Sequence, residues 1–147
     1  MKTTWLKLTL VSIFSVIIPS SCIKETIESK TTLLVERSWR FERYGLDENN
    51  NGVIEDAENY MMPCEADDVF TFMVDGAGFF EGYALPCTEG EPAVINFTWS
   101  FSNNETELAI FAAPEKINKL DENILEVYYM DQNFQGEAVK FIRRFRH

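Results

Sequence analysis

Histidine is almost missing from this sequence, because the 147 residues include only His147, at the last position. A Ser-His-Asp triad or a metal centre with several histidine ligands is therefore hard to build. A glycine-rich phosphate-binding loop is also absent. Basic residues are few: 13 lysines and arginines face 24 aspartates and glutamates, giving a formal net charge of −11. Such a chain is repelled by phosphate backbones, so we do not expect a general nucleic-acid-binding protein. An enzyme is not expected either, because the residues of these catalytic constellations are missing.

Long hydrophobic runs are lacking as well. The apolar stretch at residues 8–18 is too short to span a bilayer, which takes ~20 residues. Lys2 and Lys7 precede this stretch, and Ser20 and Ser21 follow it. A positive start, an apolar centre and small residues at the end are typical of a signal peptide. The sequence thus predicts that residues 1–21 direct export and are then removed.

The residues before Cys22 resemble the bacterial lipoprotein signal, in which such a cysteine becomes the lipidated first residue. Ser20 and Ser21 match this pattern, whereas Pro19 stands where an apolar residue, usually leucine, is expected. The resemblance implies a lipid anchor at Cys22 and a place in the bacterial cell envelope, with the outer membrane as the expected location. Ordinary secretion is the alternative. Residues 22–32 then form a lipid-attached tether, and residues 33–147 form one folded domain.

Alternation of apolar and polar residues dominates the remainder of the chain. Ile95, Phe97, Trp99 and Phe101 fall on one face of residues 94–102, and the residues between them are polar. A helix would scatter these side chains around its axis, so the segment is predicted to be a half-buried strand. The complete set of expected strands covers about 33–46, 70–74, 79–85, 94–102, 108–112, 116–120, 124–130 and 137–146.

Eight strands joined mostly by short turns predict an antiparallel sandwich or barrel. Because no segment has the period of a long helix, a parallel α/β sheet is not expected. The pattern resembles the lipocalin-like domain of small bacterial lipoproteins over residues 33–146. The resemblance rests on Trp39, the segment 64–72, Asp75-Gly76, Cys87 and the segment 99–101. It implies an all-β, eight-stranded antiparallel meander barrel with a long first loop. Lipocalins usually carry glycine two residues before this tryptophan, where this chain has Arg37.

In the wider lipocalin family an arginine of the last strand packs over the first-strand tryptophan. Arg143 shares the parity of Phe141 and Phe145, so it is the expected partner of Trp39, with Arg144 and Arg146 as alternatives. A basic, solvated last strand is the other interpretation.

Two functions remain open for such a barrel. It could bind a small apolar ligand in a pocket lined by Phe97, Trp99 and Phe101. Alternatively, the large aromatic side chains fill the interior, and the protein is a structural or interaction module of the envelope. A pocket of ~300 Å³ or more would favour ligand binding.

Cys64 and Cys87 are predicted to form a disulfide, since export to an oxidising compartment favours one. Without nearby histidines or a second cysteine pair they make a poor zinc site. The bridge is expected to pin the long first loop to the barrel.

Residues 47–58 match every specified position of the calcium-loop pattern D-x-[DN]-x-[DN]-G-x5-E. Because Ca²⁺ takes about six to eight oxygen ligands, oxygens at alternate positions of such a loop can converge on one ion. The expected ligands are Asp47, Asn49, Asn51, the Val53 carbonyl, Glu58 with both oxygens, and Glu55 directly or through water. The loop resembles an EF-hand loop without its entering helix, so a weakly bound, structural Ca²⁺ is expected. The alternative is a polar turn that holds no ion.

Overall fold

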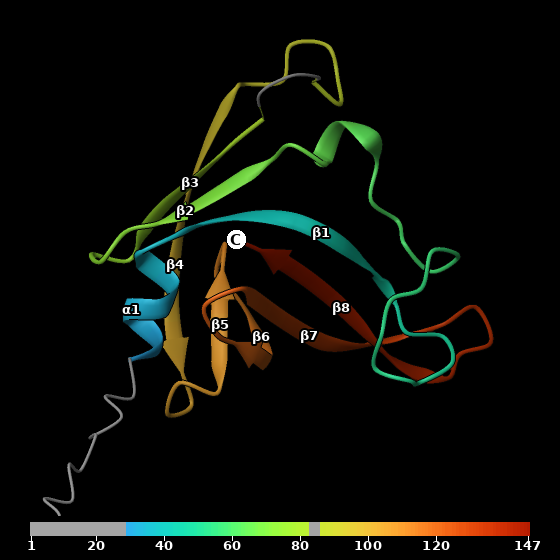
Figure 1. Cartoon of the computed structure of the whole chain (residues 1–147). Coiled ribbons are helices and arrows are strands. Elements are labelled where there is room, and N and C mark those ends of the chain that lie inside the picture. The colour runs from blue at the N-terminus through green and yellow to red at the C-terminus, as the bar shows by residue number, and fades with distance from the viewer. Residues whose placement is uncertain (1–28, 83–85) are drawn as a thin grey trace, which may run out of the picture.

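The computed structural model describes residues 29–82 and 86–147, which form a closed barrel of eight antiparallel strands (Figure 1). Each strand pairs with the next, and the last strand pairs with the first. The pairing of β1 with β8 closes the sheet, so the barrel prediction is confirmed and the sandwich is excluded. The elements are α1 (Lys30–Val35), β1 (Ser38–Leu46), the 3₁₀ turn η1 (Pro63–Glu65), β2 (Val69–Phe72), β3 (Ala77–Glu81), β4 (Val94–Ser102), β5 (Glu107–Ile110), β6 (Ala113–Leu120), β7 (Ile124–Gln132) and β8 (Ala138–Arg146).

In β4, buried and exposed side chains alternate as the sequence predicts. Phe97 and Trp99 are buried, whereas the polar residues between and beside them are exposed. The turn at Asp75-Gly76 is also confirmed, with a positive φ at Gly76. The end of the third predicted strand, at residues 83–85, lies outside the described residues.

The first strand begins later than predicted, because residues 30–35 form the short helix α1. Ser29 caps this helix by accepting a hydrogen bond from the Thr32 amide. Leu34 is fully buried, and its carbonyl accepts a hydrogen bond from the Trp39 indole at 3.0 Å. The helix therefore belongs to the folded core, where the sequence predicted the end of a tether and the start of a strand. Among the described residues, no helix has the length and apolar character needed to cross a membrane.

The two ends of the barrel differ. At the closed end, α1 contacts β2 and β6, and the interior beside it is filled by apolar side chains. At the open end lie the β1–β2 and β3–β4 loops (Figure 1). The buried core consists of Leu34, Trp39, Phe70, Phe72, Phe97, Trp99, Leu108, Ile110, Leu125, Val127 and Phe145.

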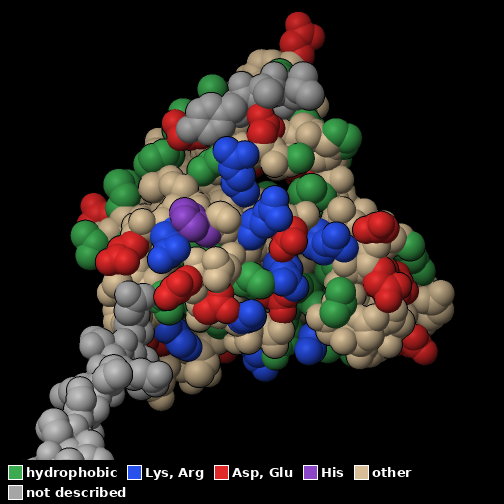
Figure 2. Space-filling model, viewed as in Figure 1, with side chains coloured by type: hydrophobic (Ala, Val, Ile, Leu, Met, Phe, Trp, Pro, Cys, Tyr) green, Lys and Arg blue, Asp and Glu red, His purple; other side chains and the backbone are tan. Residues whose placement is uncertain are grey.

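The outer surface of β1, β7 and β8 carries interleaved charges, and Figure 2 shows lysine and arginine side chains gathered on this face among acidic ones. Arg144 lies beside Arg43 and Glu126 in the sheet register. Its guanidinium forms ion pairs with Glu42 at 3.0 Å and with Glu126 at 3.4 Å. Arg144 of the basic last strand is thus neutralised by acidic neighbours on β1 and β7.

Candidate functional site

The β1–β2 loop and the β3–β4 loop are joined by a disulfide at the open end of the barrel. Cys64 and Cys87 are bonded, with their Cα atoms 5.3 Å apart, which confirms the predicted pair. Cys64 lies in η1, directly before Glu65. The bridge therefore fixes the far part of the long loop beside the barrel mouth.

The predicted calcium loop begins directly after β1, and its first and last acidic residues are withdrawn from solvent. Asp47 is 1% exposed and Glu58 is 7% exposed. The Asp47 carboxylate accepts hydrogen bonds from the backbone amides of Asn51 and Gly52, both at 2.9 Å. The Glu58 carboxylate accepts from the amides of Glu48 and Glu55, at 2.9 and 3.0 Å. Each carboxylate is thus held in place by backbone donors on both of its oxygens.

The remaining side chains of the loop follow the same scheme. The Asn49 and Asn51 carbonyl oxygens each accept the amide hydrogen two residues further on, at 2.9 and 2.8 Å. The side-chain nitrogen of Asn51, Nδ2, donates to the Glu55 carboxylate at 3.0 Å. Gly52 has φ +79°, which supplies the sharp turn for which the pattern requires glycine.

Among residues 29–82 and 86–147, no three His, Cys, Asp or Glu side chains gather closely enough to hold a metal ion. Asp47, Glu55 and Glu58 of the expected calcium set are therefore not gathered into such a group, and the other expected ligands are amide and backbone oxygens. The donor types and the backbone turn fit Ca²⁺. Calcium binding stays a prediction.

Three contacts with β1 dock this loop on the barrel. Ile54 is 2% exposed, and its carbonyl accepts a hydrogen bond from Arg43 at 2.6 Å. At Gly45 the chain returns so closely that an added Cβ would lie 1.8 Å from the Glu58 carbonyl oxygen. Gly45 also forms a β-bridge with Asn59. The loop is consequently part of the folded barrel wall rather than a projecting appendage.

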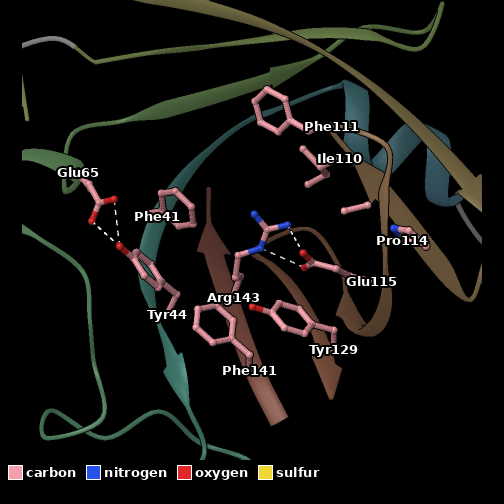
Figure 3. A pocket seen from close by; sticks show the side chains of 11 residues that line it. Phe41, Tyr44, Glu65, Ile110, Phe111, Pro114, Glu115, Tyr129, Phe141 and Arg143 are labelled. Carbon is pink, nitrogen blue, oxygen red and sulfur yellow. Dashed lines mark hydrogen bonds and ion pairs between the residues drawn. The ribbon is translucent and has the colours of Figure 1, made fainter. Parts of the chain in front are cut away.

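A cavity of about 670 Å³ opens at the same end of the barrel, where the β1–β2 connection contributes Glu65 to its lining (Figure 3). Its walls come from β1, η1, β5, β6 and the turn between them, β7 and β8, and they are mainly apolar. The lining residues are Phe41, Tyr44, Glu65, Ile110, Phe111, Ala113, Pro114, Glu115, Tyr129, Phe141 and Arg143. The volume is typical of pockets for drug-sized ligands.

One wall of the cavity carries an ion pair between β6 and β8 (Figure 3). The Arg143 guanidinium donates through Nε to Glu115 Oε2 at 3.0 Å and through Nη2 to Oε1. Burial raises the pKa of the Glu115 carboxyl above its ordinary value, while the charge and hydrogen bonds of Arg143 oppose that rise. A buried carboxylate without a partner would be costly, and Arg143 offsets that cost for Glu115.

A second polar contact lies across the cavity, between β1 and the long loop (Figure 3). The Tyr44 hydroxyl donates to the Glu65 carboxylate, whose oxygens lie 2.8 and 3.0 Å away. Burial, followed by the hydrogen bond to Glu65 and the charge of Glu65, raises the pKa of Tyr44 to about 12. Glu65 also accepts the Met62 amide hydrogen at 2.7 Å.

The three aromatic residues expected to line a pocket lie elsewhere. Phe97 and Trp99 belong to the buried core with Phe72, and the Trp99 indole donates to the carbonyls of Met73 and Ala77. Phe101 packs against Trp99, with the ring centroids 5.6 Å apart. None of the three lines the 670 Å³ cavity. Phe97 instead borders a more open hollow of about 410 Å³ beside Phe111.

The prediction that Arg143 packs over Trp39 is wrong, because its guanidinium is bound by Glu115. The register explains this difference. Arg143 stands opposite Tyr44, five positions along β1 from Trp39, and at ~3.3 Å per residue that separation exceeds the reach of the side chain. Of the alternatives, Arg144 is paired on the outer face and Arg146 is exposed.

Sequence reasoning found the inward direction of Arg143 from its parity with Phe141, but it missed the other polar residues of the cavity. Glu115 had a usable signal, since it stands two residues before the apolar Ile117 in β6. Glu65 had none, because it reaches the cavity from an irregular loop.

No protein-family model matches this chain, and a search of curated proteins finds no match either.

Proposed function

We propose that this protein is a non-enzymatic binding protein of the bacterial cell envelope whose barrel holds a small apolar ligand. The observation that carries the proposal is the cavity of about 670 Å³ at the open end. Its size suits a small molecule, and aromatic and aliphatic side chains make up most of its wall. The buried tryptophan of β1, Trp39, and the meander order support the lipocalin-like character of the barrel.

The competing proposal is an envelope module with a filled barrel that acts through its surface. The closed half of the barrel agrees with this alternative, because large side chains such as Trp39, Phe72 and Phe145 fill it. The open half favours ligand binding, because apolar surface on Phe41, Phe141 and Ile110 borders the cavity. Removing this apolar surface from water is favourable, so a ligand that covers it gains binding free energy.

A binding function is also favoured over catalysis by the state of the cavity's polar groups. Arg143 is held by Glu115, and the Tyr44 hydroxyl is held by Glu65. Groups that are saturated by partners in this way serve orientation and specificity better than proton transfer or nucleophilic attack.

We further propose that the loop from Asp47 to Glu58 holds a structural Ca²⁺. Two nearly buried carboxylates, Asp47 and Glu58, support this proposal, because buried acids are normally paired or coordinate a metal. Asn49, Asn51, Glu55 and the Val53 carbonyl would complete the oxygen ligands. An ion at this site would hold the root of the loop that reaches the cavity mouth.

The proposed location in the cell envelope rests on the sequence. It requires a signal peptide at residues 1–21 and a lipid at Cys22, both of which lie outside the described residues. The described chain starts at Ser29, beside the closed end of the barrel. A lipid seven residues earlier would tether the closed end to the membrane surface and leave the cavity mouth free to face away from it.

The binding proposal is tested by titrating the protein with N-phenyl-naphthylamine, an uncharged fluorophore that brightens in apolar surroundings. We expect saturable binding to the wild-type protein. Ala113→Trp, which places a large ring in the cavity wall, should weaken that binding about tenfold. Ala138→Trp adds the same ring at an exposed position outside the cavity and should leave binding unchanged.

If the wild-type protein and both variants bind the fluorophore equally well, or if none of them binds it, the cavity is not a ligand site. The structural-module proposal would then be favoured.

A further inference from the structure

The charges of the cavity do not cancel, and this imbalance bears on the kind of ligand. Among the described residues that line it, the charged side chains are Glu65, Glu115 and Arg143. Arg143 and Glu115 neutralise one another through two hydrogen bonds, and the pair is largely withdrawn from solvent, with side-chain exposures of 20% and 6%. The guanidinium is thus already engaged with an anion belonging to the protein.

Glu65 is held differently, because its hydrogen-bond donors are neutral. They are the phenol of Tyr44 and the backbone amide of Met62. Neutral donors orient a carboxylate without cancelling its charge. The cavity therefore keeps one net negative charge, located at its Tyr44 side (Figure 3).

Burial is the main cause of two raised pKa values in this region, and nearby acidic groups add to both. Burial raises the pKa of Asp68 to about 6, and the charges of Asp67, Glu65 and Glu91 add to that rise. In the cavity, burial raises the pKa of Tyr129, and the charges of Asp131 and Glu115 add to it against the opposing effect of Arg143. The region around the mouth consequently disfavours any further anion.

The walls supply a second feature that attracts cations. Four aromatic rings follow one another along the cavity. Phe41 and Tyr44 have ring centroids 5.5 Å apart, Tyr44 and Phe141 6.0 Å, and Phe141 and Tyr129 5.1 Å. Aromatic faces carry partial negative charge and bind ammonium groups, most strongly where water is excluded.

From these observations we infer that the ligand of the cavity is an amphiphilic organic cation, with an ammonium or quaternary ammonium group near Glu65 and an apolar body against Phe41, Phe141 and Ile110. This inference rests on the proposed ligand-binding function and narrows it to one class of ligand. A fatty acid or another anionic amphiphile is disfavoured, because its carboxylate would meet Glu65 while Arg143 is already occupied. The net charge of −11 adds a long-range attraction for cations.

The test compares three probes that share an octyl chain and differ in charge: octyltrimethylammonium, octanol and octanoate. Each is titrated, below its micelle concentration, against the protein loaded with N-phenyl-naphthylamine, and displacement is followed by fluorescence. We expect octyltrimethylammonium to bind about tenfold tighter than octanol, and octanoate to bind more weakly than octanol. Added salt should weaken only the cation's binding appreciably.

Glu65→Gln should lower the affinity for the cation about tenfold and leave that for octanol unchanged. A glutamine keeps an oxygen for the Tyr44 hydroxyl, so the cavity wall is retained. The matched control is Glu122→Gln, which removes the same charge from an exposed turn at the closed end and should change neither affinity.

The outcomes separate the two proposals. If the fluorophore binds but octanol or octanoate competes as well as the cation, the cavity binds ligands and the cationic class is wrong. The class is also wrong if Glu122→Gln weakens the cation as much as Glu65→Gln does. If neither the fluorophore nor any probe binds, the ligand-binding function itself fails.

Discussion

Gly45 is the residue on which the long β1–β2 loop closes against the barrel. Its lack of a side chain is needed for space rather than for an unusual backbone angle, since a Cβ there would meet the Glu58 carbonyl oxygen at 1.8 Å. The obstacle is a backbone atom, which cannot rotate away as a flexible side chain would. We predict that Gly45→Ala lowers the free energy of unfolding by about 3 kcal/mol, as judged by urea denaturation.

Gly136→Ala is the control for this substitution. Gly136 has φ +79° and no atom within 4 Å of an added Cβ, so alanine there meets backbone strain alone. A cost of about 1 kcal/mol is expected. If Gly45→Ala costs no more than Gly136→Ala, the loop does not close on β1 in this way.

Asp68 gives the barrel mouth a pH dependence. Its pKa is raised by burial from 3.8 to about 6, with further contributions from Asp67, Glu65 and Glu91. The folded state therefore holds the Asp68 proton more tightly than the unfolded chain does. The resulting stabilisation of the folded state is fully present below pH 3.8 and is lost as the pH rises through about 6. We predict that Asp68→Asn raises the melting temperature at pH 7 by about 2 °C and leaves it nearly unchanged at pH 4.

Glu122→Gln serves as the control, because it removes one negative charge from an exposed turn. An equal rise at pH 7 in both variants would attribute the effect to the net charge of the protein rather than to the surroundings of Asp68.

At the scale of elements, the strands were predictable and the polar lining of the cavity was largely not. In β4 the alternation is unbroken, so its buried face could be assigned from Phe97 and Trp99 alone. In β1 the register shifts between Phe41 and Arg43, and both Phe41 and Tyr44 line the cavity although they are three residues apart. Strict alternation would have turned Tyr44 outward.

Helix α1 was missed for a related reason. A helix of six residues is too short to give a readable apolar period, and its stability comes from tertiary contacts. Those contacts are the burial of Leu34 and the hydrogen bond from the Trp39 indole. The disulfide was predictable because the expected export to an oxidising compartment favours a bridge, and the shortage of other cysteines left Cys64 and Cys87 few alternatives.

The loop from Asp47 to Glu58 is the element for which we predict an ion. Millimolar Ca²⁺ should raise the melting temperature by about 5 °C, because an ion that binds only the folded state adds about 1.4 kcal/mol at ten times its dissociation constant. Glu58→Gln should remove most of this rise, since it deletes a charged ligand with two oxygens. Mg²⁺ should substitute poorly, because it requires tighter octahedral geometry.

Glu48→Gln is the matched control within the same loop. The backbone amide of Glu48 binds Glu58, but its side chain is outside the expected ligand set. This variant should keep the response to Ca²⁺. No heat on calorimetric titration with millimolar Ca²⁺, together with an unchanged melting temperature, would reduce the loop to a polar turn.

At the scale of the whole molecule, the proposals place separate tasks at the two ends of the barrel. The closed end holds α1 and the filled half of the core, and the described chain starts there at Ser29. The open end holds the cavity, the disulfide and the expected calcium loop. Because attachment and binding are assigned to opposite ends, a change at one end should leave the other unaffected.

Cys22 allows this separation to be tested. If it carries the lipid, Cys22→Ala should move the protein from the detergent phase to the aqueous phase in a partitioning experiment. The melting temperature and the affinity for N-phenyl-naphthylamine should stay the same, because the cavity lies at the far end of the barrel from Ser29. Lys24→Ala, two residues further on, is the control and should remain with the detergent. A Cys22→Ala protein that still partitions into detergent would show that the anchor lies elsewhere, and loss of fluorophore binding on release would show that the two ends are coupled.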